Sequence, residues 1–391
     1  MTTTALYASR ILTPEEEISD GVIVVEADHI VSIGHRDQIR VPPGAIDYVA
    51  TGSTIVPGFL DLHIHGAGGH DVMEANPSAL DQITSTVARY GTTSIVATTV
   101  TAPVDETCSS LAGIARYIRS HEIAGQGGPL AAEILGIHLE GPFISKARRG
   151  AHPSDSIAMP SVEMLDKFLK ASDGLVKIVT LAPELPGAMA VIESALAAGV
   201  VVAIGHTDAD YEQSRAAIQA GARHAAHVYN AMRPFSHRDP GVIGAILTDP
   251  EVTAEIIADG VHVAGPAIQV LLGAKGFDTV LLVSDGMAAT GMPDGKYRLG
   301  NFDVSVHGGV CRNAEGRLAG STLTLDYALR NIVALGLPFA DAVRMATVLP
   351  ARRLGLAGKK GILAVGADAD LVVLTPELRI AGVMTRGAGL A

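Results

Sequence analysis

The chain has 391 residues, a length that suits one large α/β domain with a small accessory unit. Its net charge of −12 disfavours nucleic-acid binding, so an anionic ligand would need a local basic patch. No apolar run reaches the roughly 18 residues of a membrane span, and the N-terminus lacks the pattern of a secretory signal. Only Cys108 and Cys311 occur, so we expect a cytoplasmic protein without disulfides or a thiolate metal site.

Eight apolar, β-rich runs lie between Pro57 and Asp285, and helical spacing follows most of them. Strand–helix alternation predicts a parallel sheet, and eight such units close a (β/α)8 TIM barrel. The expected strands are Phe59–Ile64, Thr93–Thr98, Ile134–Leu139, Val176–Leu181, Val200–Ile204, His224–Val228, Val252–Ile257 and Val280–Val283. The expected helices are Pro77–Tyr90, Val162–Ser172, Ala188–Ala198, Tyr211–Ala220, Gly265–Gly273, Leu323–Leu335 and Pro338–Leu349.

The two ends of the chain have a different pattern, with short strands separated by turns. We expect residues 1–56 and 355–391 to form together a small β-sandwich domain, and residues 57–354 to form the barrel. A glycine-rich, hairpin-like insertion at Gly295–Gly316 could border the active site. The expected terminal strands are Leu6–Leu12, Gly21–Glu26, His29–Gly34, Ser53–Val56, Asp370–Val373 and Ile380–Thr385.

Potential metal ligands stand at the ends of five of the eight predicted strands. His63 and His65 alternate along the first strand, so both imidazoles face the same side. The other ends carry Glu140, His206, His227 and Asp285. Each residue alone could cap a helix or shape a turn, but barrel enzymes place their sites at the carboxyl ends of the strands. The pattern therefore predicts a metal centre.

Imidazole and carboxylate ligands without thiolate favour zinc, although iron, manganese or cobalt would also fit. Such an ion lowers the pKa of a bound water to about 7, and we assign Asp285 as the base that takes its remaining proton. The role of His138, on the same face as Glu140, stays open between ligation and orientation of other groups. Arg148 and Arg149 are interpreted as solvated surface charge, whereas Arg233, His237 and Arg238 could meet an anionic substrate.

Eight motifs are spread over nearly the whole chain. HLEGPF at 138–143 and HVYNAM at 227–232 are together quite specific; the others are PGFLDLHIHG at 57–66, GAHP at 150–153, GHTDA at 205–209, DGVHV at 259–263, SDGMAATG at 284–291 and LAGSTLTL at 318–325. In these motifs the chain resembles the amidohydrolase superfamily and, within it, the family of N-acetylglucosamine-6-phosphate deacetylases. The resemblance implies hydrolysis of an N-acetyl group from a phosphorylated amino sugar.

The resemblance also implies roles for single residues. Glu140, His206 and His227 resemble the principal metal ligands, and Asp285 the catalytic acid–base. His152 would help the metal to polarise the acetamide carbonyl. Arg238 would reach into the neighbouring site of a homodimer. The implied substrate contacts are Ala151, His152, Asn230, Ala231, Arg238, His262, Leu318, Ala319 and Gly320.

The chain departs from the family at two places. Some members carry Gln- and Asn-type residues at the positions of His63 and His65 and are one-metal enzymes, so this chain could bind one or two ions per site. Gly286 stands where many members have alanine.

Two rival functions remain to be compared. A cyclic amidase of the dihydroorotase type would use a carboxylated lysine on the fourth strand, but Lys177 lies at the start of that run. A non-catalytic barrel scaffold should have lost part of the ligand set, which is complete here.

Overall fold

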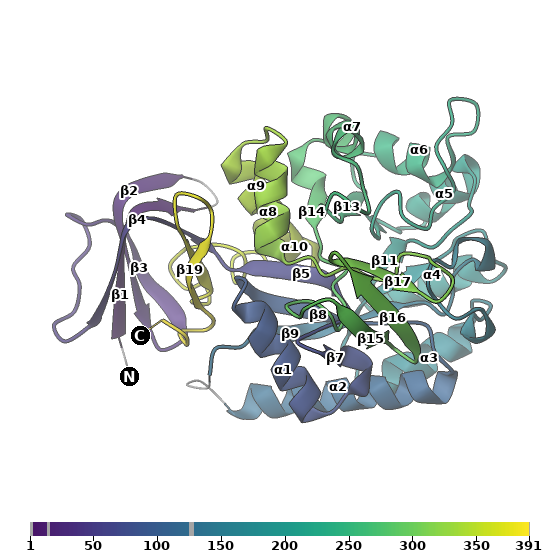
Figure 1. Cartoon of the computed structure of the whole chain (residues 1–391), viewed down its shortest axis with the longest axis horizontal. Helices are drawn as coiled ribbons and strands as arrows, with labels where there is room; N and C mark the ends of the chain where they lie inside the picture. The colour runs from purple at the N-terminus through teal and green to yellow at the C-terminus, as the bar shows by residue number, and fades with distance from the viewer. Residues whose placement is uncertain (1–2, 14–15, 125–128, 391) are drawn as a thin grey trace.

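The computed structural model describes residues 3–13, 16–124 and 129–390. A helix-ringed barrel makes up most of the molecule, and a small β domain lies at its side (Figure 1). Across the described residues, every helix is too short or too polar to cross a membrane.

The central sheet confirms the predicted (β/α)8 barrel. Its eight parallel strands are hydrogen-bonded in the order of the sequence. The sixth strand is shorter than expected, because it ends at Ala225 rather than Val228. The strands are β5 (Phe59–Ile64), β8 (Thr92–Thr99), β9 (Glu133–Glu140), β10 (Val176–Leu181), β11 (Val201–Ile204), β12 (His224–Ala225), β13 (Thr253–Ile256) and β14 (Val280–Leu282).

The barrel closes just beyond the ends of β5 and β14. The Asp285 amide donates to His63 O at 2.9 Å, and the His65 amide donates to Gly286 O at 2.7 Å. The first and last strands are thereby joined at their carboxyl ends. This closure brings the histidine pair of the first strand beside Asp285, which is 222 positions later in the chain than His63.

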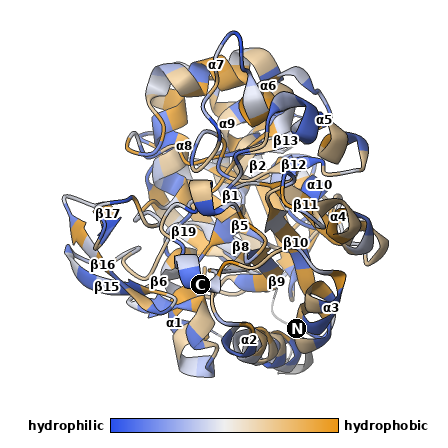
Figure 2. Ribbon diagram, turned by 90° about the vertical axis from the view of Figure 1, so that its right-hand side faces the viewer, coloured by the Kyte–Doolittle hydropathy of each residue, from blue (hydrophilic) through white to orange (hydrophobic). Residues whose placement is uncertain are grey.

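Helices lie around the buried strands (Figure 2). Two of them, α2 and α6, were not predicted. Helix α6 is buried along most of its length, so its sequence lacks the amphipathic pattern of a surface helix. The helices are α1 (Pro77–Ala88), α2 (Val104–Ala124), α3 (Val162–Ala171), α4 (Ala188–Ala197), α5 (Tyr211–Gln219), α6 (Gly241–Thr248), α7 (Gly265–Lys275) and α8 (Leu325–Ala334).

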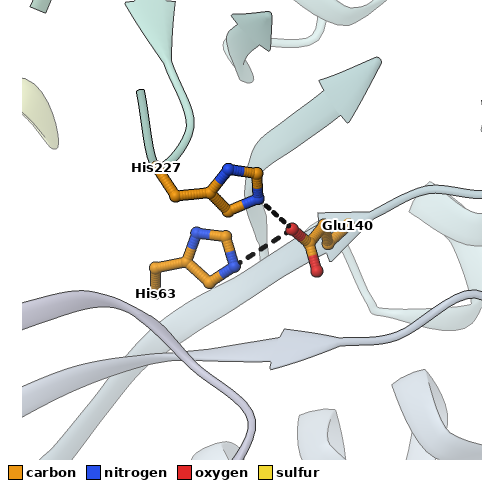
Figure 3. Close-up of side chains that lie close together, drawn as sticks. All are labelled: His63, Glu140 and His227. Carbon is orange, nitrogen blue, oxygen red and sulfur yellow. Dashed lines mark hydrogen bonds and ion pairs between the residues drawn. The ribbon is translucent and has the colours of Figure 1, made fainter. Parts of the chain in front are cut away.

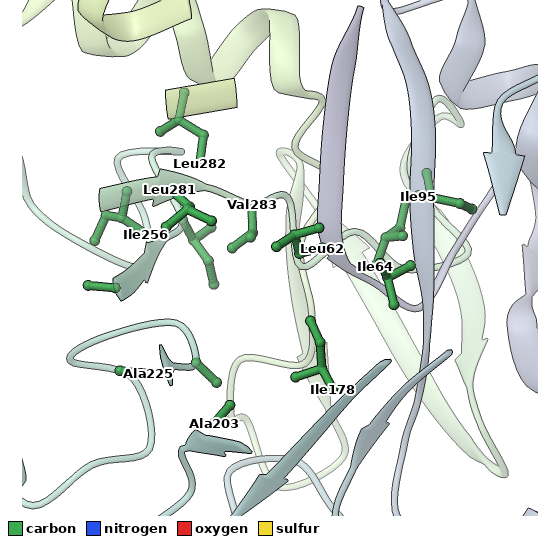
Figure 4. Close-up of a cluster of buried hydrophobic side chains, with 14 of the residues drawn as sticks. Leu62, Ile64, Ile95, Ile178, Ala203, Ala225, Ile256, Leu281, Leu282 and Val283 are labelled. Carbon is green, nitrogen blue, oxygen red and sulfur yellow. The ribbon is translucent and has the colours of Figure 1, made fainter. Parts of the chain in front are cut away.

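Aliphatic side chains from the strands and from the helices around them form the main core, part of which is drawn in Figure 4. Leu62, Ile178 and Ile256 are completely buried within it. Each such side chain contributes roughly 1.5–3 kcal/mol to folding, so the strand ends are held on a rigid base.

The predicted helix Pro338–Leu349 is wrong in its continuity. The chain forms α9 (Phe339–Ala346) and α10 (Val348–Arg353), with a break at Thr347, whose φ is −132° and ψ is −86°. Pro350 has no amide hydrogen, and its ring would clash with the carbonyl of Ala346 in a continuous helix. It is tolerated in the first turn of the new helix.

Both termini contribute to one six-stranded sheet, as predicted for the small domain. Apolar side chains from its strands share one core, including Leu6, Ile23, Ile55 and Val373. Strands β1, β2 and β4 are longer than expected because their polar ends carry no apolar alternation. The strands are β1 (Thr3–Leu12), β2 (Glu17–Glu26), β3 (His29–His35), β4 (Ile46–Pro57), β18 (Leu371–Leu374) and β19 (Ile380–Met384).

The expected insertion is a three-stranded antiparallel sheet. Its strands are β15 (Gly295–Leu299), β16 (Phe302–His307) and β17 (Val310–Asn313). Leu299, Val304 and Val306 pack on Met287 and Ala319, next to Asp285. The short elements are β6 (Gly66–Ala67), β7 (His70–Asp71), η1 (Val72–Glu74), η2 (Lys146–Arg148), η3 (Ser154–Ser156) and η4 (Phe277–Thr279).

A buried lysine joins the small domain to the barrel. Lys360 is 2% exposed and its Nζ lies 2.6 Å from Glu133 Oε2 at the start of β9. It also lies 2.9 Å from Asp368 Oδ2 and 2.7 Å from Asp370 Oδ2. Burial alone would lower the pKa of Lys360, but the charges of Asp370, Glu133 and Asp368 raise it.

Replacing Lys360 by Met should lower the free energy of unfolding by about 3–5 kcal/mol, because buried carboxylates lose their cation. The raised pKa means that the ion cluster is complete at neutral pH and would be lost only as the pH rises into the strongly alkaline range. Urea denaturation at pH 7 measures the change. Lys359→Met, at an exposed neighbour, should change stability by less than about 0.5 kcal/mol. Equal effects would refute the assignment.

Candidate metal centre

Five imidazole rings converge on the buried carboxylate of Glu140, the last residue of β9. His63 and His227 point their Nε2 atoms at the same oxygen (Figure 3). The distances from Glu140 Oε1 are 3.2 Å to His63 Nε2, 3.1 Å to His206 Nε2 and 3.0 Å to His227 Nε2, and those from Oε2 are 3.3 Å to His65 Nε2 and 3.2 Å to His152 Nε2.

A second carboxylate, Asp285, lies on the other side of the histidine pair. Its Oδ1 is 3.2 Å from His65 Nε2 and 3.7 Å from His63 Nε2. The predicted ligands thus meet in one place, although five strands supply them. Their atoms form overlapping groups close enough to share an ion, among them His63–His65–Asp285 and His63–Glu140–His227.

Hydrogen bonds on the far side of three rings fix the tautomer that a metal ligand needs. His65 Nδ1 donates to Thr98 O at 3.0 Å, and His206 Nδ1 donates to Arg148 O at 3.0 Å. His63 Nδ1 donates to the carboxylate of Glu255 at 2.9 Å. When these rings are neutral, each Nε2 therefore has its lone pair directed to the centre, as a metal ligand requires. His63 Nε2 is buried and has no hydrogen bond of good geometry to the described residues, so a cation fits this donor set.

His152 has the opposite arrangement. The backbone amide of Thr101 donates to His152 Nδ1 at 3.2 Å, so the proton of the neutral ring is on Nε2. This nitrogen therefore donates a hydrogen bond toward the centre. The geometry suits contact with an anionic or carbonyl oxygen better than metal ligation.

Backbone strain places several of these side chains. His206, His227 and Asp285 have φ values of 48°, 27° and 50°, in the left-handed region that non-glycine residues rarely occupy. Each follows the end of its strand. Such strain costs of order 1–3 kcal/mol per residue and persists only where the surroundings hold it. Here it turns the side chains inward.

The electrostatics of the cluster show why it would bind a cation. Burial would raise the pKa of Asp285, but the hydrogen bond from His65 and the charge of His63 lower it to about 2. Burial would lower the pKa of His65, yet Asp285 and Glu140 raise it to about 9. Without an ion, protons on the imidazoles neutralise the carboxylates.

Two further buried residues belong to the site. The first, His138, has no free lone pair for a metal. His138 Nδ1 donates to Leu62 O at 3.2 Å and Nε2 accepts from Thr180 Oγ1 at 2.7 Å, so both nitrogens are occupied. Burial lowers the pKa of His138 to about 3 and keeps it neutral. Glu255, on β13, was missed; an acidic residue within an apolar strand was the signal that could have found it.

The interpretation of Arg148 and Arg149 as solvated charge is wrong. Arg149 Nη1 donates to His152 O at 2.7 Å, and its Nη2 lies 2.7 Å from Glu315 Oε2 beyond β17. Arg148 Nε donates to Asp208 Oδ1 at 2.7 Å. Arg149 therefore joins the loop that carries His152 to the inserted sheet. Only the tertiary structure pairs residues so far apart in the chain.

Most of the predicted substrate residues lie beside the cluster. The Ser321 amide donates to Asp285 O at 2.7 Å, which places the segment 318–320 next to Asp285. Ala231 O accepts from the amide of Thr207, adjacent to His206. His262 Nδ1 lies 2.6 Å from Asp259 Oδ2, which leaves Nε2 free. The remaining neighbours are Ala151, which packs on the inserted sheet, and Asn230, which donates to His227 O.

Arg238 is the exception among these residues. It is exposed on the loop between β12 and α6, and it forms no hydrogen bond or ion pair with any part of the chain that the structure describes. The neighbouring Arg233 is instead paired with Asp239 at 2.6 Å. Among the described residues, no contact places Arg238 at the metal centre of its own chain.

Gly286 is closely surrounded. A Cβ there would lie 2.8 Å from Thr290 Oγ1 and 2.9 Å from Ser284 Oγ, so alanine would require both hydroxyls to shift.

Comparisons with known proteins agree with this geometry. The profile of the amidohydrolase family matches residues 54–388. The chain belongs to the amidohydrolase family. It is 40% identical to an N-acetylglucosamine-6-phosphate deacetylase of Vibrio furnissii, over 97% of this chain and 93% of that protein. It is 38% identical to an N-acetylgalactosamine-6-phosphate deacetylase of Escherichia coli O157:H7, over 98% of both chains.

A solved structure is similar over its whole length. A mutant N-acetyl-D-glucosamine-6-phosphate deacetylase of Mycobacterium smegmatis, in complex with N-acetyl-D-glucosamine-6-phosphate, has a TM-score of 0.91 and 40% identity, and all of each chain is covered. The family is metal-dependent, and the His/Glu/Asp cluster is where this chain could hold an ion.

Metal binding should release protons at pH 7, because a ligand imidazole must be neutral and the pKa of His65 is about 9 in the metal-free site. Calorimetric titration of the metal-free protein with Zn²⁺, in two buffers of different ionisation enthalpy, gives the proton count. We expect about one proton or more per chain, and affinity that rises with pH up to about 9. The His65→Gln variant should release fewer protons than wild type when it binds Zn²⁺. Binding without proton release would contradict the assigned charge state.

Proposed function

We propose that this protein hydrolyses the N-acetyl group of N-acetylglucosamine 6-phosphate to give glucosamine 6-phosphate and acetate. The observation that carries the proposal is the buried histidine–carboxylate centre at the carboxyl ends of the barrel strands, in a chain whose full-length relatives are deacetylases of this kind. The intact ligand set argues against a non-catalytic scaffold.

The residues that would hold the metal form two adjacent groups. Glu140, His206 and His227 would hold one ion, and His63, His65 and Asp285 a second, with Glu140 between them. Zinc is our proposed ion, since the donors are imidazole nitrogens and carboxylate oxygens. When bound, such an ion polarises an amide carbonyl and acidifies water.

Asp285 is the proposed general base and acid. Its carboxylate faces the same space as the ligand nitrogens, with Oδ1 3.2 Å from His65 Nε2. It would accept the proton of the attacking water and return it to the departing amine.

His152 is the proposed donor to the acetamide carbonyl. Its Nε2 proton, fixed by the Thr101 amide at Nδ1, points toward the centre. A donor in this place stabilises the negative charge that develops on the carbonyl oxygen during attack. Arg149 supports this arrangement through its hydrogen bond to His152 O.

The remaining predicted contacts would hold the sugar and its phosphate. Ala151, His262 and the segment Leu318–Ala319–Gly320 would contact the sugar, and Asn230 and Ala231 its phosphate. We propose a homodimer in which Arg238 of one subunit reaches the phosphate in the neighbouring site. The exposure of Arg238 supports this role, since it has no partner among the described residues of its own chain.

Two alternatives concern the substrate. The Escherichia coli relative makes N-acetylgalactosamine 6-phosphate a second candidate, since it is also a phosphorylated amino sugar. A cyclic amidase is disfavoured, because Lys177 is the second residue of β10, at the end of the strand opposite the metal centre. We further propose a cytoplasmic location and domain boundaries at 56/57 and 354/355; the two cysteines are free thiols.

Acetate release from N-acetylglucosamine 6-phosphate tests the function. We expect chelator-sensitive turnover that is much slower with the unphosphorylated sugar and absent with dihydroorotate. Asp285→Asn should lower kcat by about 10²–10⁴-fold, because the proton acceptor is lost. The variant should still bind an ion at Glu140, His206 and His227, measured by elemental analysis. If metal-loaded wild-type protein released no acetate, this substrate would be ruled out. If the variant kept the wild-type kcat, Asp285 would not be the base.

Arg238→Ala should raise KM for the phosphorylated sugar far more than for N-acetylglucosamine, since an arginine–phosphate contact is lost. Mixing this variant with Asp285→Asn and allowing subunits to exchange tests the dimer. Each mixed dimer would have one complete site, so activity should recover to about a quarter of wild type. No recovery in a preparation that sedimentation shows to exchange would disprove contribution across the interface.

A further inference from the structure

A buried carboxylate behind the metal centre has no role in the reaction proposed above. Glu255, in the middle of β13, is completely buried together with His63 and His224. Its Oε2 accepts from His63 Nδ1 at 2.9 Å and from the amide of His227 at 3.1 Å. Its Oε1 lies 2.9 Å from His224 Nε2. Both oxygens are therefore in use.

Glu255 is itself held from behind. His224 is the first residue of β12, and its Nδ1 lies 2.7 Å from Thr253 Oγ1. A chain of contacts therefore runs from Thr253 through His224 and Glu255 to the ring of His63. A buried carboxylate in such a chain has no solvent to reorient it, so its direction is fixed by these partners.

The contacts of Glu255 with the two halves of the centre differ in kind. Glu255 accepts a hydrogen bond from the ring of His63, which fixes its tautomer and turns Nε2 toward the centre, where His63 belongs to the group His63–His65–Asp285 and also to His63–Glu140–His227. To His227 it bonds only the main-chain amide. His206 has its own support, the carbonyl of Arg148. The ring that depends most directly on Glu255 is His63.

We propose that Glu255 is a positioning residue that makes His63 a strong ligand and so sets the affinity of the second ion, at His63, His65 and Asp285. The inference rests on the metal centre of the proposed function and extends it. A carboxylate that accepts the far proton of a ligand imidazole raises the basicity of the ligating nitrogen. Burial of an acidic residue among apolar neighbours costs folding free energy, and the positioning role explains why Glu255 is present in this strand.

Glu255→Gln provides the test, because it keeps the size of the side chain and removes its charge. Metal-free full-length protein is titrated with Zn²⁺ in the presence of a competing chelator. Wild type should bind two ions per chain. In the variant, one of the two should bind about 10–100-fold more weakly, while the other changes by less than about threefold. His65→Ala should weaken the same ion, which assigns it.

Two further variants separate positioning from general damage. Asp61→Asn alters another buried carboxylate, which accepts from the amides of His63 and Ser284 but contacts no ligand ring; both ions should bind as in wild type. His224→Asn leaves Glu255 in place and removes its support, so the second ion should weaken by about threefold or more. This variant also carries the test if Glu255→Gln does not fold, as judged by circular dichroism.

Three results would overturn the inference: equal weakening of both ions, no weakening of either, or a wild-type chain that binds only one. None of these depends on acetate release. A one-ion protein that still deacetylates the sugar phosphate would leave the proposed function standing and remove only the role of Glu255.

Discussion

The carboxylate of Glu140 lies out of solvent among five imidazole nitrogens, and the rest of the centre depends on that arrangement. A buried carboxylate needs compensating positive charge, which either imidazole protons or a metal ion can supply. The carboxylates raise the pKa of His65, so protons would supply this charge without an ion. Exchange of these protons for an ion would keep the site close to neutral and would convert the imidazoles into ligands.

Assembly of this centre has a cost that the barrel offsets. His206, His227 and Asp285 occupy left-handed backbone conformations, and Glu255 is a charge within the apolar core. Each is unfavourable alone. Eight paired strands and their completely buried aliphatic side chains provide the stability that holds them. The backbone strain is confined to the carboxyl ends of the strands, and the stabilising apolar core lies beneath them. The scaffold can therefore support a strained, reactive site.

Loops complete the centre by contacts across the chain. Arg149 ties His152 to Glu315 of the inserted-sheet region, and Gly320 and Ser321 lie against Asp285. The proposed carbonyl donor, the proposed base and the sugar contacts are thus held in one frame. Such positioning matters for hydrolysis, because small displacements of donors or bases lower the rate steeply. At the opposite end of β9, Lys360 fixes the small domain through Glu133.

The sequence by itself determined the barrel and pointed to the cluster of candidate ligands. The reason is that apolar strands alternating with amphipathic helices allow few folds, and parallel strands bring their carboxyl ends together. It missed helix α6, whose burial removes the amphipathic pattern, and it continued α9 past the break at Thr347 as far as Leu349. Only the tertiary structure decided that both nitrogens of His138 are hydrogen-bonded, that Arg149 connects the His152 loop to Glu315, and that Glu255 lies behind His63. The physical reason is that tautomers, ion pairs and second contacts depend on atoms brought together from distant positions, which no local pattern records.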